Sequence, residues 1–169
     1  MSGFRFRTRT LTTLAMLTAL EIVLSRFLSL NAWNIKIGFN FVPVVAAAIL
    51  YGPIGAGLVA ALGDFLGALL FPIGTYFPGF TLTAFLMGLC YGLFLYKKQS
   101  FPRILAAVAL HQLVLSLLLN TLWISVLYGS PFWPLLLSRL PQCAILAAVQ
   151  LAVIPLLVKL LPRLKGTGL

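Results

Sequence analysis

Three basic side chains, Arg26, Lys36 and Arg139, stand within apolar sequence in a chain that is 62% hydrophobic and only 8% charged. An arginine offers a planar pair of donors that matches a carboxylate, and a lysine offers a point charge. A cation inside a membrane costs about 2.5–3.5 kcal/mol on insertion scales and usually marks a functional site. The three residues therefore favour an anionic ligand, although side chains that reach out to lipid headgroups remain an alternative, above all for Lys36.

Amides and aromatic rings gather in and beside three connections, at 31–36, 71–79 and 128–134, where formal charge is scarce. Rings can stack on a flat ligand and amides can match its polar edge. An interfacial belt of Trp and Tyr is the structural alternative. The candidates for a pocket are Asn31, Trp33, Phe39, Asn40, Tyr76, Phe77, Phe80, Asn120 and Trp123.

Glu21 and Asp64 are the two acids of the chain. Each can pair with a basic residue, Glu21 being close to the face of Arg26, and each can instead bind a ligand; Asp64 is kept as a ligand-binding candidate. His111 and Gln112 are expected to make hydrogen bonds between helices. Both cysteines lie in apolar runs and are expected to be small buried thiols.

The sequence lacks several motifs that are typical of enzymes, nucleotide-binding proteins and metal sites. No GxxxxGK[ST] phosphate loop, HExxH pair or metal-ligand cluster occurs, and a lone histidine with two scattered acids makes a poor catalytic set. We expect neither an enzyme nor a cofactor. The formal charge of +10 does not indicate nucleic acid, because the basic residues cluster at three junctions instead of forming a basic domain.

Apolar runs of this length predict an all-α integral membrane protein whose residues 1–169 form a single domain. Breaks rich in Pro, Gly and polar residues separate six expected membrane spans. The expected spans are 11–30, 37–50, 54–70, 80–96, 104–127 and 135–161.

Six spans place both termini on one side of the membrane. The basic junctions lie at the N-terminus, at 97–103 and at the C-terminus, which all fall on that side, and the positive-inside rule makes it cytoplasmic. Small residues at Gly63–Gly67 and Gly88–Gly92 predict close helix packing. Ala15 and Ala19 form a further small-residue pair on the first span.

Residues 38–96 resemble the folate-specific S components of energy-coupling factor (ECF) vitamin transporters, and "ALEIVLSRF" at 19–27 fits the same family. The stretch "FPIGTYFPGFTLTAF" at 71–85 carries much of the resemblance, whereas "AALGD" at 60–64 departs from the family pattern by one small residue. The likeness covers most of the first four spans and weakens over the last two.

The resemblance implies a six-helix bundle in a bacterial cell membrane that captures folate at its outer face with high affinity. It implies a partner transmembrane coupling subunit and two ATPase subunits, and reorientation of the loaded protein in the membrane. In this family the AxxxA pair docks to the partner, which maps onto Ala15 and Ala19, and an arginine near the end of the first span maps onto Arg26. The alternatives are an S component for another vitamin and an ion-coupled small-molecule exchanger that uses Asp64.

Overall fold

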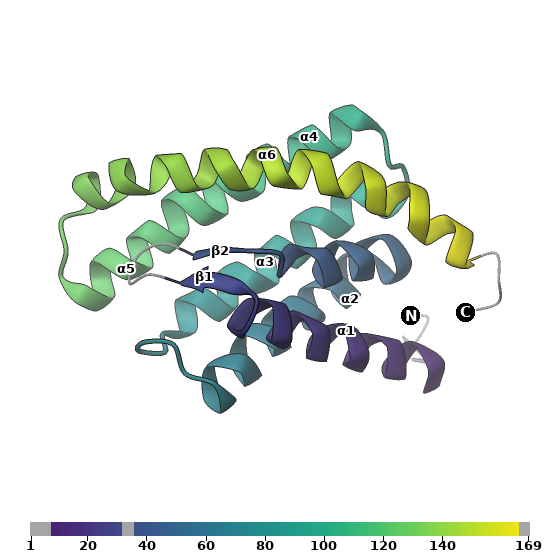
Figure 1. Cartoon of the computed structure of the whole chain (residues 1–169), viewed down its shortest axis with the longest axis horizontal. Helices are drawn as coiled ribbons and strands as arrows, with labels where there is room; N and C mark the ends of the chain where they lie inside the picture. Colours follow the sequence, from purple (N-terminus) through teal and green to yellow (C-terminus); the bar gives the residue numbers. More distant parts are fainter. Residues whose placement is uncertain (1–7, 32–35, 166–169) are drawn as a thin grey trace, which may run out of the picture.

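The computed structural model describes residues 8–31 and 36–165, with the side chains of residues 31 and 162–165 left out of the description. A helical stretch runs without interruption from α4 through the π-helix η1 to α5, and a two-stranded hairpin follows α1 (Figure 1). The elements are α1 (Thr8–Arg26), β1 (Ser29–Asn31), β2 (Lys36–Gly38), α2 (Phe41–Leu70), α3 (Pro78–Leu95), α4 (Phe101–Ala109), η1 (Leu110–Leu119), α5 (Asn120–Tyr128) and α6 (Phe132–Lys165).

Within the described ranges, 4 helices are long and apolar enough to cross a membrane: Phe41–Leu70, Pro78–Leu95, Phe101–Tyr128 and Phe132–Leu161. The first helix, α1, is not among them, because its first turns are rich in threonine and it carries Arg9, Glu21 and Arg26. The chain is thus a mostly helical membrane protein, as predicted.

The hairpin was not predicted. Strands β1 and β2 pair antiparallel, with Leu30 opposite Ile37, so the first helix ends at Arg26 instead of Leu30 and the next begins at Phe41 instead of Ile37. An all-α description is therefore incomplete. Strands of 3 residues have no room for the alternating pattern that identifies longer strands.

The predicted break at 51–57 is a sharp turn inside α2 at Gly52, which has φ 81° and ψ −166°. Only glycine adopts that region readily. The following residue, Pro53, packs on Gly92 near the end of α3, whereas Asp64 contacts Thr81 near its beginning. The second part of α2 therefore runs antiparallel to α3 and opposite to its own first part (Figure 1).

Helices α2 and α3 pack with their backbones almost in contact. A Cβ at Gly88 would meet the backbone of Ala56 and Gly57, and one at Gly92 would meet the backbone of Pro53. In lipid, such close packing replaces the hydrophobic drive that holds helices together in water. The buried core continues from this contact to Tyr91 and Ile154, both 0% exposed.

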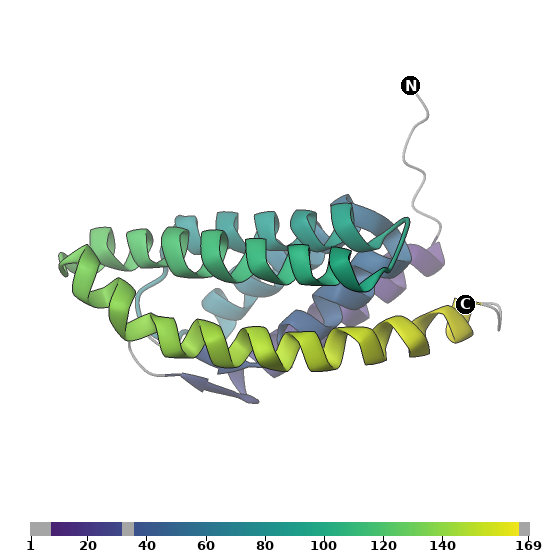
Figure 2. The same ribbon diagram turned by 90° about the horizontal axis from the view of Figure 1, so that it is seen from above.

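The two ends of the molecule differ in charge. The start of α1, the connection from α3 to α4 and the end of α6 lie at one end of the bundle, where Arg9, Lys97, Lys98 and Lys159 are exposed (Figure 1). The hairpin, the segment between α2 and α3, and the turn from α5 to α6 lie toward the other end. Helix α6 runs alongside α4, η1 and α5 for most of its length (Figure 2).

Candidate ligand-binding cavity

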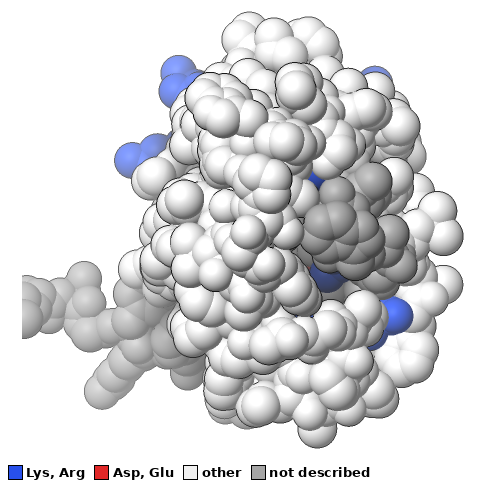
Figure 3. All heavy atoms as spheres, turned by 90° about the vertical axis from the view of Figure 1, so that its left-hand side faces the viewer, with Lys and Arg blue, Asp and Glu red and all other residues white. Residues whose placement is uncertain are grey.

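A cavity of about 270 Å³ extends into the bundle from the end that carries the hairpin. Figure 3 shows this end as a hollowed surface with basic side chains inside the hollow, and no acidic side chain is visible among the described residues of this view. Every long helix and the segment between α2 and α3 contribute to the wall. The polar and aromatic lining residues are Arg26, Lys36, Asn40, Phe41, Asp64, Thr75, Tyr76, Phe80, Thr83, His111, Ser116, Asn120, Tyr128, Arg139, Gln142 and Gln150.

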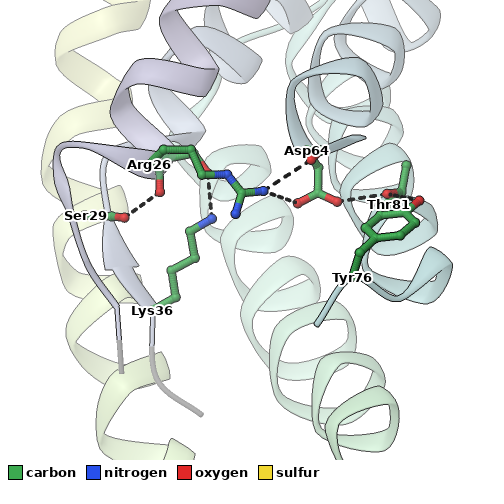
Figure 4. Close-up of polar contacts among 7 residues, drawn as sticks. Arg26, Ser29, Lys36, Asp64, Tyr76 and Thr81 are labelled. Carbon is green, nitrogen blue, oxygen red and sulfur yellow. Dashed lines mark hydrogen bonds and ion pairs between the residues drawn. The ribbon is translucent and has the colours of Figure 1, made fainter. Parts of the chain in front are cut away.

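A chain of polar contacts joins α1, α2 and α3 at the mouth of the cavity (Figure 4). Arg26 Nη2 donates a hydrogen bond to the main-chain oxygen of Asp64 at 3.2 Å and lies 3.7 Å from Asp64 Oδ1. On its other side, Asp64 Oδ2 accepts from Thr81 Oγ1 at 2.9 Å, and Thr81 contacts the Tyr76 hydroxyl at 3.1 Å. Asp64 thereby pairs with a basic residue while its carboxylate remains at the cavity wall.

Two glycines of α2 make room for the charged residues of α1. A Cβ at Gly63 would meet the carboxylate of Glu21, and one at Gly67 would lie 2.8 Å from Arg26 Nε. Glu21 is 3% exposed. The small-residue pattern in α2 therefore accommodates polar side chains of α1, whereas the pattern in α3 brings two backbones together.

Lys36 reaches the cavity from β2. Its amine donates to Ser25 Oγ at 2.6 Å, and its carbonyl accepts from Gln142 Nε2 at 2.7 Å, which ties the hairpin to α6. Burial lowers the pKa of the Lys36 amine, and the nearby Arg26 guanidinium lowers that pKa further. An anion beside Lys36 would favour its charged form.

Arg139 has the least exposed side chain among the described cations, at 4% exposed. Its Nε and Nη1 atoms have no hydrogen-bond partner among the described residues, and neither acid of the chain forms an ion pair with it there. Gln142 Oε1 and Asn120 Oδ1, also on the lining, lack partners in the same part of the structure. Burying a donor or an acceptor without a hydrogen-bond partner costs free energy. The cavity therefore favours a polar, anionic ligand that would supply those partners.

The inner end of the cavity is polar but uncharged. Tyr91 of α3 lies between His111 of η1 and Gln150 of α6, and all three side chains are joined by hydrogen bonds. His111 and Gln150 line the cavity.

An aromatic cluster supports the wall, and one of its members, Phe80, also lines the cavity. The rings of Phe77 and Trp123 are 5.6 Å apart, and those of Phe77 and Phe80 are 6.2 Å apart. Trp123 Nε1 donates to Thr83 Oγ1 at 3.0 Å, which fixes a lining hydroxyl. The absence of a side chain at Gly79 lets Trp123 lie against the start of α3.

The structure brings most of the predicted site residues to one place. Arg26, Lys36, Asn40, Asp64, Tyr76, Phe80, Asn120 and Arg139 line the cavity. Phe77 and Trp123 lie behind its wall, as described above. Phe39 is 48% exposed and faces a separate apolar groove beside α6. Trp33 and the side chain of Asn31 lie outside the described residues.

Sequence reasoning missed the inner end of the cavity. His111 makes the predicted contact between helices, but it also lines the cavity, which was not expected. The same prediction for Gln112 is wrong for the described structure, where neither of its polar atoms has a partner. Tyr91, Thr81 and Gln150 were not proposed at all, because a single polar residue in an apolar run gives no sign of the helix it faces.

Two other predictions concern residues away from the cavity. Ala15 and Ala19 are exposed on α1, available to a partner. Cys90 and Cys143 are buried free thiols, as predicted.

The fold and the cavity define a membrane-embedded binding protein for a small polar molecule. Residues 9–158 match the model of the ECF transporter substrate-specific component, and the chain belongs to that family. A folate transporter FolT of Clostridium novyi (strain NT) is 42% identical over 153 residues, which cover 90% of this chain and 89% of that protein. One of Leuconostoc mesenteroides subsp. mesenteroides is 38% identical over 134 residues, covering 78% and 72%. A crystal structure of FolT bound with folic acid superposes with a TM-score of 0.86 at 35% identity, covering 90% of this chain and 94% of that one.

Proposed function

We propose that this chain is the folate-binding S component of an ECF transporter and that folate occupies the cavity. Folate combines a flat heterocycle, an aminobenzoyl ring and a glutamate tail with two carboxylates. The lining offers aromatic rings, amides and cations in one enclosed space. The relatives named above carry the same assignment in their names.

The observation that carries the proposal is the buried guanidinium of Arg139, whose Nε and Nη1 atoms have no partner among the described residues. Its Nε and Nη1 atoms each hold an unused N–H donor, and a charged guanidinium donates strong hydrogen bonds to a carboxylate. Lys36 adds a second cation that no acid pairs with in the described structure, whereas Arg26 already contacts Asp64. A dicarboxylate tail would balance Lys36 and Arg139 together.

The proposed topology has six crossings with both termini in the cytoplasm, in a bacterial cell membrane. The turn at Gly52 supports it, since it divides α2 into two segments of opposite direction. The exposed basic residues at the end opposite the cavity support the orientation, because cytoplasmic loops favour Lys and Arg. The cavity then opens to the outside.

The energy for release would come from other subunits, a transmembrane coupling subunit and two ATPases, since this sequence holds no phosphate-binding loop. We assign Ala15 and Ala19 to docking on the coupling subunit. Their small side chains would let a partner helix approach closely in lipid.

Titration of the purified protein in detergent with folic acid tests the proposal. We expect a Kd in the nanomolar range, which corresponds to about −12 kcal/mol, with riboflavin, thiamin and pantothenate failing to compete. Arg139→Ala should weaken binding by about a hundredfold, because a buried charged partner is lost. Lys98→Ala removes an exposed cation at the opposite end and should leave Kd unchanged. Absence of folic acid binding by the unmodified protein would refute the assignment.

A further inference from the structure

A buried carboxyl group stands behind the cations of the cavity. Glu21 of α1 is buried, and its Oε2 atom lies against Gly63 with no hydrogen-bond partner among the described residues. Asn40, which lines the cavity, is hydrogen-bonded to the Glu21 side chain. Glu21 itself is not part of the lining, so the proposed ligand contacts do not use it. A titratable group in this place can respond to the charge of a ligand that it does not touch.

Glu21 lies one helical turn from the residue that holds the Lys36 amine. Lys36 reaches from the hairpin to the end of α1 (Figure 4), where its amine donates to Ser25 Oγ at 2.6 Å. Glu21 and Ser25 are four residues apart on the buried face of α1, and side chains with this spacing are neighbours on a helix. Burial lowers the pKa of the Lys36 amine most, and of the two acids that oppose this, Glu21 has a larger effect than Asp64. Glu21 is therefore the counter-ion of Lys36, although no ion pair joins them among the described residues.

The charged residues around Glu21 come from three elements. Arg26 is on the same helix, Lys36 on β2 and Asp64 on α2, and they are the charged groups that act on its carboxylate. Arg26 lies 3.7 Å from Asp64. With both acids ionised, these four residues carry two positive and two negative charges. The group is therefore balanced in the empty protein, and balanced buried charge costs less than an uncompensated one.

A dicarboxylate ligand changes this balance. Together with Arg139, the site holds three cations against two acids, which is a net charge of +1. The two carboxylates of a glutamate tail stay ionised above about pH 6, so the ligand would turn the net charge negative. One carboxylate balances Arg139, and the other, at Lys36, replaces Glu21 as the counter-ion. Glu21 is then a buried negative charge close to another one, which favours its neutral form.

We propose that Glu21 takes up one proton when the ligand's carboxylates bind, so that the loaded site is electrically neutral. This inference rests on the proposed function and adds a linked protonation to it. The proton comes from the solvent and joins the carboxylate of Glu21, whose Oε2 atom has no other partner in the described structure. Because the bound state then holds one proton more than the empty state, affinity rises as the pH falls, by up to about tenfold per pH unit.

Calorimetric titration with folic acid, in buffers of different ionisation enthalpy, counts the protons taken up on binding. We expect about one proton per folic acid for the unmodified protein. Glu21→Gln has nearly the same size and cannot take up the proton, so its uptake should fall to zero. Between about pH 6 and pH 7.5, the Kd of the unmodified protein should rise by about tenfold, whereas that of Glu21→Gln should change by less than about twofold.

A ligand with one carboxylate gives a second measurement, which carries the test if Glu21→Gln does not fold. Pteroic acid keeps the ring system of folic acid and lacks the glutamate, so it brings a single negative charge. That charge neutralises the site without a proton. We therefore expect the unmodified protein to bind pteroic acid with no proton uptake, and an uptake equal to that with folic acid would contradict the charge balance.

Thr18→Val is the matched control, because Thr18 is an uncharged residue buried on the same face of α1; its proton uptake should equal that of the unmodified protein. Uptake that persists in Glu21→Gln would assign the proton to another group, such as Lys36 or His111, and overturn the inference. Folic acid binding by the unmodified protein without proton uptake would also overturn it. Absence of folic acid binding refutes the proposed function instead, so the two failures are distinguishable.

Discussion

Gly67 of α2 lies directly against Arg26 of α1: a methyl group at Gly67 would be 2.8 Å from Arg26 Nε. The neighbouring contact between Arg26 and Asp64 therefore depends on the missing side chain at Gly67 as well as on charge. This close approach holds the guanidinium at the mouth of the cavity.

Gly67→Ala should displace the Arg26 guanidinium and weaken folic acid binding by about tenfold while the protein remains folded. Titration in detergent measures the change. Leu66→Ala, at an exposed neighbouring position, is the control and should bind normally. Binding by Gly67→Ala at the unmodified affinity would show that the position of Arg26 is unimportant.

Lys36→Met should affect ligand binding and ligand-free stability in opposite directions. Removing a buried amine relieves the desolvation that lowers its pKa, so the empty protein should unfold at an equal or higher temperature. Folic acid affinity should fall by about tenfold or more, because a cation facing the carboxylates is lost. Thermal unfolding with and without folic acid measures both effects, and unchanged affinity would exclude Lys36 from the site.

The turn at Gly52 should tolerate no side chain. Gly52→Ala forces φ 81° and ψ −166° on an L-residue and brings its methyl group to 3.3 Å from the Tyr96 ring. We expect a loss of about 1–3 kcal/mol in unfolding free energy. Gly129→Ala is a matched comparison, because Gly129 also has positive φ but nothing within 4 Å. A loss at Gly52 no larger than that at Gly129 would contradict the structural role of this turn.

Substitution on the exposed face of α1 should separate binding from transport. Ala15→Trp and Ala19→Trp should leave folic acid binding intact and abolish uptake in cells that contain the whole complex, because a bulky ring blocks close helix contact. Leu93→Trp, at a 68% exposed position of α3, controls for general damage and should support uptake. Loss of folic acid binding in the α1 variants would contradict the docking role.

The helices could be predicted because each is marked by local sequence, namely its own hydropathy and the proline or glycine residues that bound it. The break at Gly52–Pro53 and the cations Arg26 and Arg139 all follow from such signals. The hairpin did not, since its register depends on packing of Lys36 and its neighbours against Ser25 and Gln142. Helix ends were also misplaced where the strands begin.

The inner half of the cavity was hidden for a different reason. Tyr91, His111 and Gln150 are far apart in sequence, and each is an isolated polar residue. His111 and Ser116 both line the cavity, although α-helical spacing would put them on different faces of their helix. Only a π-helix aligns them, and nothing in the apolar sequence around them indicates that change of pitch.

The cavity walls belong to two sets of helices, and this has a mechanical consequence. Arg26 and Asp64 stand on the closely packed α1 and α2, whereas Arg139 and Gln150 stand on α6. A ligand that contacts both sets of helices bridges them, so its binding free energy adds to the stability of the folded bundle. The bound ligand is thereby one of the structural elements that hold the loaded protein together.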